Sequence, residues 1–73
     1  MRARRAPARY IGRRMKAARV EARLSQEKLA AKIDMTRCNY ARIERGSTNV
    51  TIETLLRIAR GIGVDLEVGF VVR

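Results

Sequence analysis

The chain has 73 residues, of which 17 are Lys or Arg and 7 are Asp or Glu, so its formal net charge is +10. One cysteine and no histidine exclude an intrachain disulfide and a structural zinc site, which needs about four Cys or His ligands. A sequence this basic is typical of proteins that bind the phosphates of nucleic acids, and we expect no enzymatic activity, no metal and no other cofactor.

The N-terminal third carries most of the excess charge, because residues 1–23 contain nine basic residues and one acidic residue. Residues 1–8 have too few apolar groups to pack, which predicts a flexible basic arm. A helix is expected over residues 8–22. Its inward-facing positions at helical spacing are Ile11, Met15, Ala18 and, as a further candidate, Ala22.

Residues 24–46 read LSQEKLAAKIDMTRCNYARIERG and predict two short helices joined by a tight turn. Ser25 is a good N-cap for a helix over 26–33, and Thr36 caps a second helix that Gly46 ends. The connection spans about three residues, the length found in helix-turn-helix motifs. The residues expected to face inward are Leu29, Ala30, Ile33, Tyr40 and Ile43.

A further amphipathic helix is expected after a polar loop, with Thr51 as its N-cap. Its wide apolar face comprises Ile52, Leu55, Leu56, Ala59 and Ile62. These elements together predict an all-α fold of four to five helices. We divide the chain into the arm (1–8), a helical domain (9–63) and a C-terminal segment (64–73).

The C-terminal segment has an apolar side chain at every second position over residues 64–72, which predicts a half-buried strand. A lone strand cannot pair its backbone groups within the chain, and a domain of this size buries a small core. We therefore expect the strand to pair with its copy in a homodimer. The dimerisation residues would be Leu66, Val68, Phe70 and Val72. The alternative is an extended tail that packs Leu66 and Phe70 on its own helices.

From Ile11 to Val64 the chain resembles the XRE family of Cro and phage-repressor proteins, whose domains are lambda-repressor-like. The family pattern runs LSQxxLAxxxGxSxxxIxxIExG and later TLxxIAxxLGV, and this chain has LSQEKLAAKIDMTRCNYARIERG and TLLRIARGIGV. Two glycines usual in the family are replaced by Arg23 and Asp34. Asp adopts the left-handed backbone conformation more readily than most residues.

The resemblance implies that the helix after Thr36 is similar to the recognition helix, with Arg37, Cys38 and Arg42 at its base-reading positions. An arginine can donate two hydrogen bonds to guanine O6 and N7. Alternatives stay open for each residue. Arg37 would otherwise be a solvated surface residue, Cys38 a small residue that permits close approach, and Arg42 a phosphate contact.

Phosphate contacts are implied for Gln26, Asn39, Arg45, Ser47, Thr48 and Asn49. At the position of Gln26 the family uses glutamine to bind phosphate and to buttress the recognition helix. Loop polarity alone would also explain the last three residues of the set. Arg19 and Glu44 match an ion pair that joins the first helix to the recognition helix.

The arm has two interpretations, because it either contacts phosphates or the minor groove or is a solvated tail that raises the association rate. The arm contacts would come from Arg2, Arg4, Arg5 and Arg9.

The function expected from the resemblance is a transcriptional regulator, acting as a repressor, that binds an inverted repeat in double-stranded DNA as a homodimer. Such a protein would be cytoplasmic, associated with the nucleoid when bound to DNA, and free of membrane contacts. One alternative is an antitoxin of a type II toxin–antitoxin module that represses its own operon and binds a toxin, because HipB-type antitoxins also add a strand after the last helix. Another alternative is an RNA-binding or coactivator-like adaptor protein.

Overall fold

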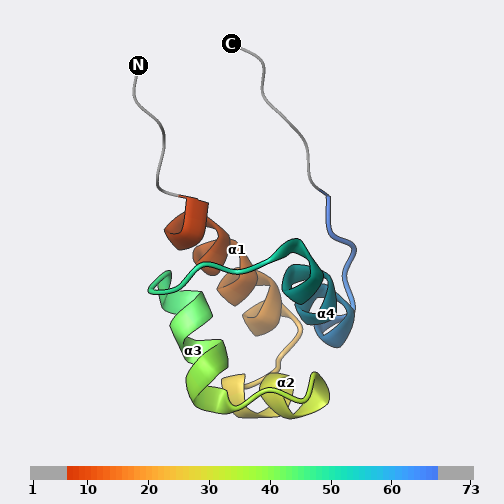
Figure 1. The fold of residues 1–73 in the computed structure, drawn as a ribbon. Coiled ribbons are helices and arrows are strands. Elements are labelled where there is room, and N and C mark those ends of the chain that lie inside the picture. Colours follow the sequence, from red (N-terminus) through yellow and green to blue (C-terminus); the bar gives the residue numbers. More distant parts are fainter. Residues whose placement is uncertain (1–6, 68–73) are drawn as a thin grey trace, which may run out of the picture.

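The computed structural model describes residues 7–67, which fold into four helices. The helices are α1 (Pro7–Glu21), α2 (Gln26–Lys32), α3 (Arg37–Arg45) and α4 (Ile52–Ile62). Figure 1 shows α1 between α3 and α4, with the short α2 across one end of the group. Within 7–67 no helix has the length and apolarity needed to span a membrane.

Capping residues set where these helices begin and end. Ser25, Thr36 and Thr51 each accept a hydrogen bond from the backbone N–H three residues later, at 3.0 to 3.1 Å. α3 ends at Gly46 and α4 at Gly63, both in the left-handed conformation with φ of 76° and 95°. The predicted caps are confirmed, and the predicted ends of the first two helices differ from the observed ends by one residue.

Two turns use the left-handed conformation without a glycine. Arg23 (φ 61°) follows α1 and Asp34 (φ 57°) lies between α2 and α3. These are the two positions at which the resembled family usually has glycine. An L residue costs about 1 kcal/mol in this conformation, so surrounding contacts must hold each turn in place.

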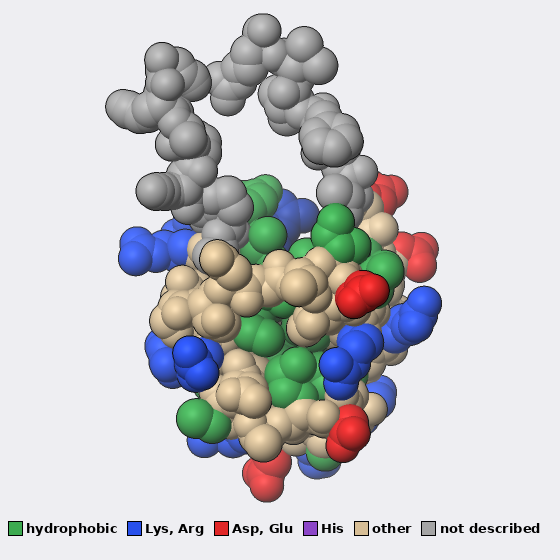
Figure 2. Space-filling view, viewed as in Figure 1, with side chains coloured by type: hydrophobic (Ala, Val, Ile, Leu, Met, Phe, Trp, Pro, Cys, Tyr) green, Lys and Arg blue, Asp and Glu red, His purple; other side chains and the backbone are tan. Residues whose placement is uncertain are grey.

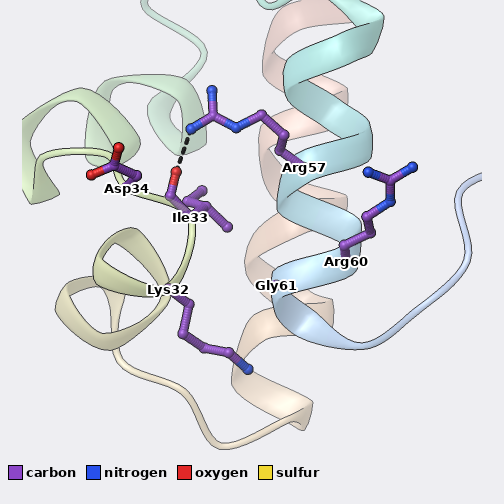
Figure 3. Close-up of a pocket in the computed structure, with 6 residues that line it drawn as sticks. All are labelled: Lys32, Ile33, Asp34, Arg57, Arg60 and Gly61. Atoms are coloured by element: carbon purple, nitrogen blue, oxygen red, sulfur yellow. Dashed lines mark hydrogen bonds between the residues drawn. The ribbon is translucent and has the colours of Figure 1, made fainter.

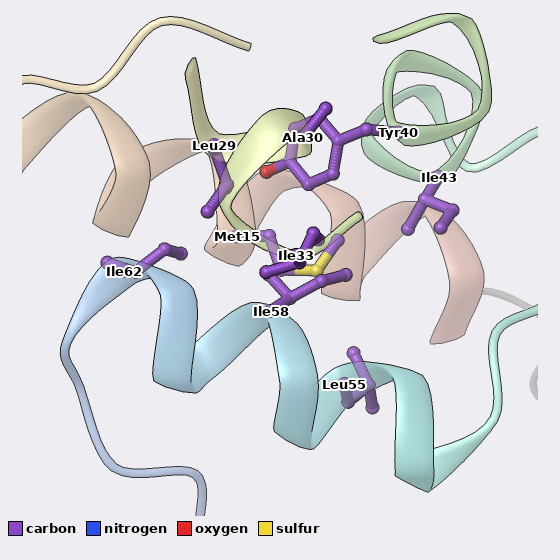
Figure 4. Packing of buried hydrophobic residues seen from close by; sticks show 9 residues of the cluster. All are labelled: Met15, Leu29, Ala30, Ile33, Tyr40, Ile43, Leu55, Ile58 and Ile62. Carbon is purple, nitrogen blue, oxygen red and sulfur yellow. The ribbon is translucent and has the colours of Figure 1, made fainter. Parts of the chain in front are cut away.

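The apolar core lies where the four helices meet (Figure 4). Leu29, Tyr40 and Ile58 are its most deeply buried large side chains, with at most 1% of their surface exposed. The rest of the buried cluster consists of Met15, Ala30, Ile33, Ile43, Leu55 and Ile62. The predicted inward faces of the two helices in residues 24–46 are therefore confirmed.

Three apolar positions differ from the prediction. Ala22 follows the end of α1 and is exposed, so it does not extend the inward stripe. On α4, Ile52 is 58% exposed and Leu56 is 38% exposed. The neighbouring helices cover the side of α4 that carries Ile58 and Leu55, and the apolar face of α4 is wider than the surface they cover.

Residues 64–67 follow α4 without strand structure. Leu66 is partly buried and packs against the core of its own chain, as the alternative of a packed tail predicts for this residue. Residues 68–73, with the predicted dimerisation residues Val68, Phe70 and Val72, lie outside the described part of the chain. The strand and its pairing therefore stay predictions.

Helix α1 packs directly on the end of α3 through Gly12, which is buried. A Cβ atom at Gly12 would clash with the carbonyl oxygen of Glu44 and lie 2.9 Å from that of Ile43. Both neighbours are backbone atoms, which cannot rotate away as a side chain can. The absence of a side chain at Gly12 therefore sets the distance between α1 and α3.

We expect Gly12→Ala to lower the free energy of unfolding by about 2–3 kcal/mol, because α1 must move away from α3 to admit the methyl group. Urea denaturation followed by circular dichroism measures this change. The exposed residue Ala17 provides a control on the same helix, because Ala17→Gly changes only helix propensity, at about 1 kcal/mol. Unchanged stability of Gly12→Ala would contradict the proposed close packing.

Candidate nucleic-acid interface

Helix α3 has a buried side and an exposed side. Tyr40 and Ile43 point into the core, whereas Arg37, Cys38 and Arg42 are exposed. Cys38 is a free thiol. The three residues that match the base-reading positions therefore lie on the surface, and no other part of the described fold covers them.

A hollow of about 240 Å³ lies beside α3, between this helix, the following loop and the start of α4. Four of the predicted site residues line it, namely Asn39, Arg42, Thr48 and Asn49. Apolar side chains are visible between α3 and α4 on this face (Figure 2). Thr54 of α4 also lines the hollow and is not among the predicted site residues, although it begins the second matching segment of the family pattern, TLLRIARGIGV.

The other residues predicted to bind phosphate lie outside this hollow. Ser47 closes the end of α3, because its hydroxyl and its backbone N–H both donate to the carbonyl of Arg42 at 3.1 Å. Arg45 is exposed in the last turn of α3. Gln26 lies at the start of α2 and is partly buried.

The start of α1 lies next to the end of α3. A Cβ atom at Gly46 would lie 2.7 Å from the Cα atom of Arg9, so the two backbones are nearly in contact. The side chain of Arg9 is exposed. Figure 2 shows Lys and Arg side chains along the edge of the molecule that α1 and α3 form. Of the four predicted arm contacts, Arg9 lies within the described residues, and the other three do not.

A buried ion pair connects α1 to α3. Arg19 donates from Nε to Oε2 of Glu44 at 2.6 Å and from Nη2 to Oε1 at 3.2 Å. Arg19 also donates to the carbonyl of Leu24 at 2.8 Å. Gln26 of α2 donates from Nε2 to Oε1 of Glu44 at 2.9 Å. One carboxylate on α3 thus receives donors from two other helices.

The protonation behaviour of this cluster follows from burial and hydrogen bonding. Burial alone would raise the pKa of Glu44, but the interactions with Arg19, then with Tyr40 and Gln26, outweigh it and lower this pKa below its ordinary value. The bond to Glu44 raises the pKa of Arg19. Burial raises the pKa of the Tyr40 phenol, whose oxygen has no hydrogen-bond partner in the structure.

This cluster orients α3. A buried arginine and a buried carboxylate are costly to separate, so the helix cannot rotate without breaking the bonds to Arg19 and Gln26. The amide of Gln26 buttresses the helix, as the resemblance implies, and its contact with phosphate stays a prediction. Among residues 7–67 we find no group of His, Cys, Asp and Glu side chains that could hold a metal ion.

The model of a helix-turn-helix family matches residues 15–68. The control protein C.MunI from Mycoplasma sp is 46% identical over 43 residues, which are 59% of this chain and 58% of that protein. The immunity repressor protein of Bacillus phage phi105 is 38% identical over 56 residues, which are 77% of this chain and 39% of the repressor. The chain spans about half the length of the curated relatives it matches.

A solved structure is also similar. The restriction-modification controller protein C.AhdI from Aeromonas hydrophila superposes with a TM-score of 0.79 at 30% sequence identity. The match covers 84% of this chain and 92% of that chain. The names of these three relatives describe control or repression, and none of the three names describes an enzyme.

The lowered pKa of Glu44 predicts a pH-dependent stability. The folded-state pKa lies below the unfolded one, so the stabilisation is complete above the ordinary Glu value of about 4.3 and is lost as pH falls through the folded pKa. We expect Glu44→Gln to lower the free energy of unfolding by about 3 kcal/mol at neutral pH, because Arg19 then stays buried without a counter-charge.

Urea denaturation at several pH values measures this dependence. The difference between the parent chain and Glu44→Gln should narrow as the pH falls below 4. Glu21→Gln is the control, because Glu21 is an exposed carboxylate at the end of α1. A difference that stays constant from neutral to acid pH would refute the role assigned to Glu44.

Proposed function

The chain belongs to the XRE-type helix-turn-helix family, and we propose that it is a sequence-specific DNA-binding repressor of transcription that acts as a homodimer. The observation that carries this proposal is the exposed pair Arg37 and Arg42 on a helix whose orientation is fixed by the buried Glu44 cluster. The control and repressor proteins among the relatives support the same class of function.

Base reading is assigned to α3. An arginine in the first turn of a helix lies at the positive end of the helix dipole, so stability gives no reason for Arg37 at this position. Arg37 instead fits a bidentate contact to guanine in the major groove. Arg42 follows within the same helix, and Cys38 lies one turn before it on the same side. Cys38 is small enough to contact a thymine methyl group.

Phosphate binding is assigned to the polar rim around α3. Asn39, Thr48 and Asn49 line the hollow beside α3, and their short side chains and nearby backbone groups suit phosphate oxygens. Arg45 and Ser47 extend this rim along the end of α3. Gln26 would contact phosphate at the start of α2. Arg9 continues the basic edge toward the arm, where Arg2, Arg4 and Arg5 would add contacts.

Dimerisation would give the protein two recognition helices, spaced about 34–36 Å apart to match successive major grooves on one face of the duplex. Apolar side chains that the monomer leaves exposed support this part of the proposal. Ile52, Leu56 and Val64 are 58%, 38% and 45% exposed and lie on α4 and directly after it. They precede the apolar positions of the C-terminal segment, which we expect to add to the same contact.

The antitoxin alternative has no support among the relatives, whose names describe control proteins and a repressor. We therefore propose no toxin partner. An RNA-binding protein or an adaptor would bind duplexes of all sequences equally weakly. Selection of bound sequences from a random duplex pool tests the proposed function directly, because a regulator enriches an inverted repeat and the other classes do not.

The two types of contact make different predictions. Arg37→Ala should reduce discrimination at one base pair of each half-site by about 1–3 kcal/mol, in addition to a smaller loss of affinity for random duplex that follows from the lost charge. Arg45→Ala should weaken binding to all duplexes alike and reduce the salt slope by about one. Fluorescence anisotropy with the selected duplex and with random duplex, at several salt concentrations, separates the two effects. Equal losses on both duplexes for Arg37→Ala would contradict its base-reading role.

The dimer contact also has a direct test. Leu56→Glu should raise the dimer dissociation constant at least about tenfold, because it places a charge in an apolar contact. Analytical ultracentrifugation measures this constant. Val20→Glu is the matched control, because Val20 is 55% exposed and lies on α1, outside the proposed contact. A dimer equally strong in both variants would exclude α4 from the interface.

A further inference from the structure

Arg57 of α4 makes a hydrogen bond to a helix end that precedes the recognition helix. Its guanidinium donates to the carbonyl oxygen of Ile33, the C-cap residue of α2 (Figure 3). Carbonyl groups in the last turn of a helix lack a partner within the helix. The bond therefore satisfies a polar group that α2 itself leaves free.

The chain after Ile33 leads directly to α3. Asp34 is exposed and adopts the left-handed conformation, Met35 is partly buried, and Thr36 then caps α3. The left-handed conformation costs free energy even for Asp, which adopts it more readily than most L residues, so contacts around the turn help to maintain it. The contact of Arg57 reaches the residue immediately before Asp34.

We infer that Arg57 is a positioning residue for the recognition helix. It fixes the α2–α3 turn through the carbonyl of Ile33 and so sets the angle at which Arg37 and Arg42 meet DNA. This inference rests on the proposed function of α3. Arg57 itself need not touch the DNA.

The packing of α4 on α2 brings the two groups within reach. A Cβ atom at Gly61 would lie 2.6 Å from Cγ2 of Ile33 and 2.8 Å from Cδ1 of Leu29, so Gly61 permits the close approach. The side chain of Arg57 is therefore long enough to reach the carbonyl oxygen of Ile33 at the end of α2. α3 packs mainly on α1 and α2, so this bond is a direct link from α4 to the turn.

Arg60 provides a matched comparison one turn further along α4. Arg57 and Arg60 both line a hollow of about 440 Å³ together with Lys32 and Asp34, and both are exposed overall. Figure 3 shows Arg57 reaching toward the carbonyl of Ile33, whereas Arg60 projects away from it. The two arginines thus have similar charge and surroundings, and they differ in the bond to the turn.

Amide hydrogen exchange of the full chain without DNA tests the first half of the inference. Arg57→Gln should raise exchange at Asp34 and Met35 about tenfold, because the turn opens more often without its anchor. Arg60→Gln removes the same charge and should leave these two amides unchanged. Equal exchange in the two variants would overturn the inference.

DNA binding tests the second half. The ratio of affinities for the selected duplex and for random duplex should fall about fivefold in Arg57→Gln and stay constant in Arg60→Gln. Loss of one positive charge weakens both duplexes alike and cancels in this ratio. Faster exchange with an unchanged ratio would show that the turn does not position α3, and the inference would fail. A parent chain without sequence preference would refute the proposed function, while the exchange measurement would still decide whether Arg57 holds the turn.

Arg57→Lys covers the case in which Arg57→Gln unfolds. Lysine keeps the charge but has a compact head in place of the planar fork, so it holds the carbonyl of Ile33 less well. Exchange at Asp34 and Met35 should rise in Arg57→Lys and stay unchanged in Arg60→Lys. Identical exchange in these two lysine variants would equally overturn the inference.

Discussion

The orientation of α3 depends on the buried carboxylate of Glu44. This group accepts hydrogen bonds from Arg19 on α1 and from Gln26 on α2, so a single side chain of α3 connects three helices. A buried ion pair contributes little net stability, because the cost of removing both charges from water offsets their attraction. The ion pair instead fixes the relative orientation of the helices, because the carboxylate can accept both donors in only one arrangement of α1, α2 and α3. The exposed arginines of α3 owe their direction to this arrangement.

Small residues allow the helices to approach closely enough for these polar contacts. Gly12 brings the backbone of α1 against the end of α3, and Gly61 brings α4 against α2. At Gly46 the end of α3 meets the backbone of Arg9. Arg19 and Arg57, which connect neighbouring helices, therefore lie on helices that a glycine allows to pack closely: α1 on α3 through Gly12, and α4 on α2 through Gly61. Packing and polar contacts therefore act on the same helix pairs.

The sequence predicts those features that depend on neighbouring residues. The N-caps, the left-handed end of α3 at Gly46 and the inward faces of α2 and α3 follow from local spacing, whereas the base-reading positions of α3 are implied by the family resemblance. The pairing of Arg19 with Glu44 could be expected only from the family resemblance. The bond from Arg57 to Ile33 spans 24 residues and has no local pattern. Contacts between distant segments also decide which apolar residues of α4 are buried. Ile52 and Leu56 match the helical spacing but lie outside the surface that the other helices cover.

Under the proposed function, one side of α3 serves folding and the other side serves DNA recognition. Its inward residues carry the core and the Glu44 cluster, whereas Arg37, Cys38 and Arg42 are exposed and lie outside the buried core. A helix of nine residues is too short to be stable alone, so the rest of the domain supplies its structure. We therefore expect substitutions on the outward side to be nearly independent of folding, so that under the proposed function mutation could change the preferred DNA sequence without compensating changes in the core.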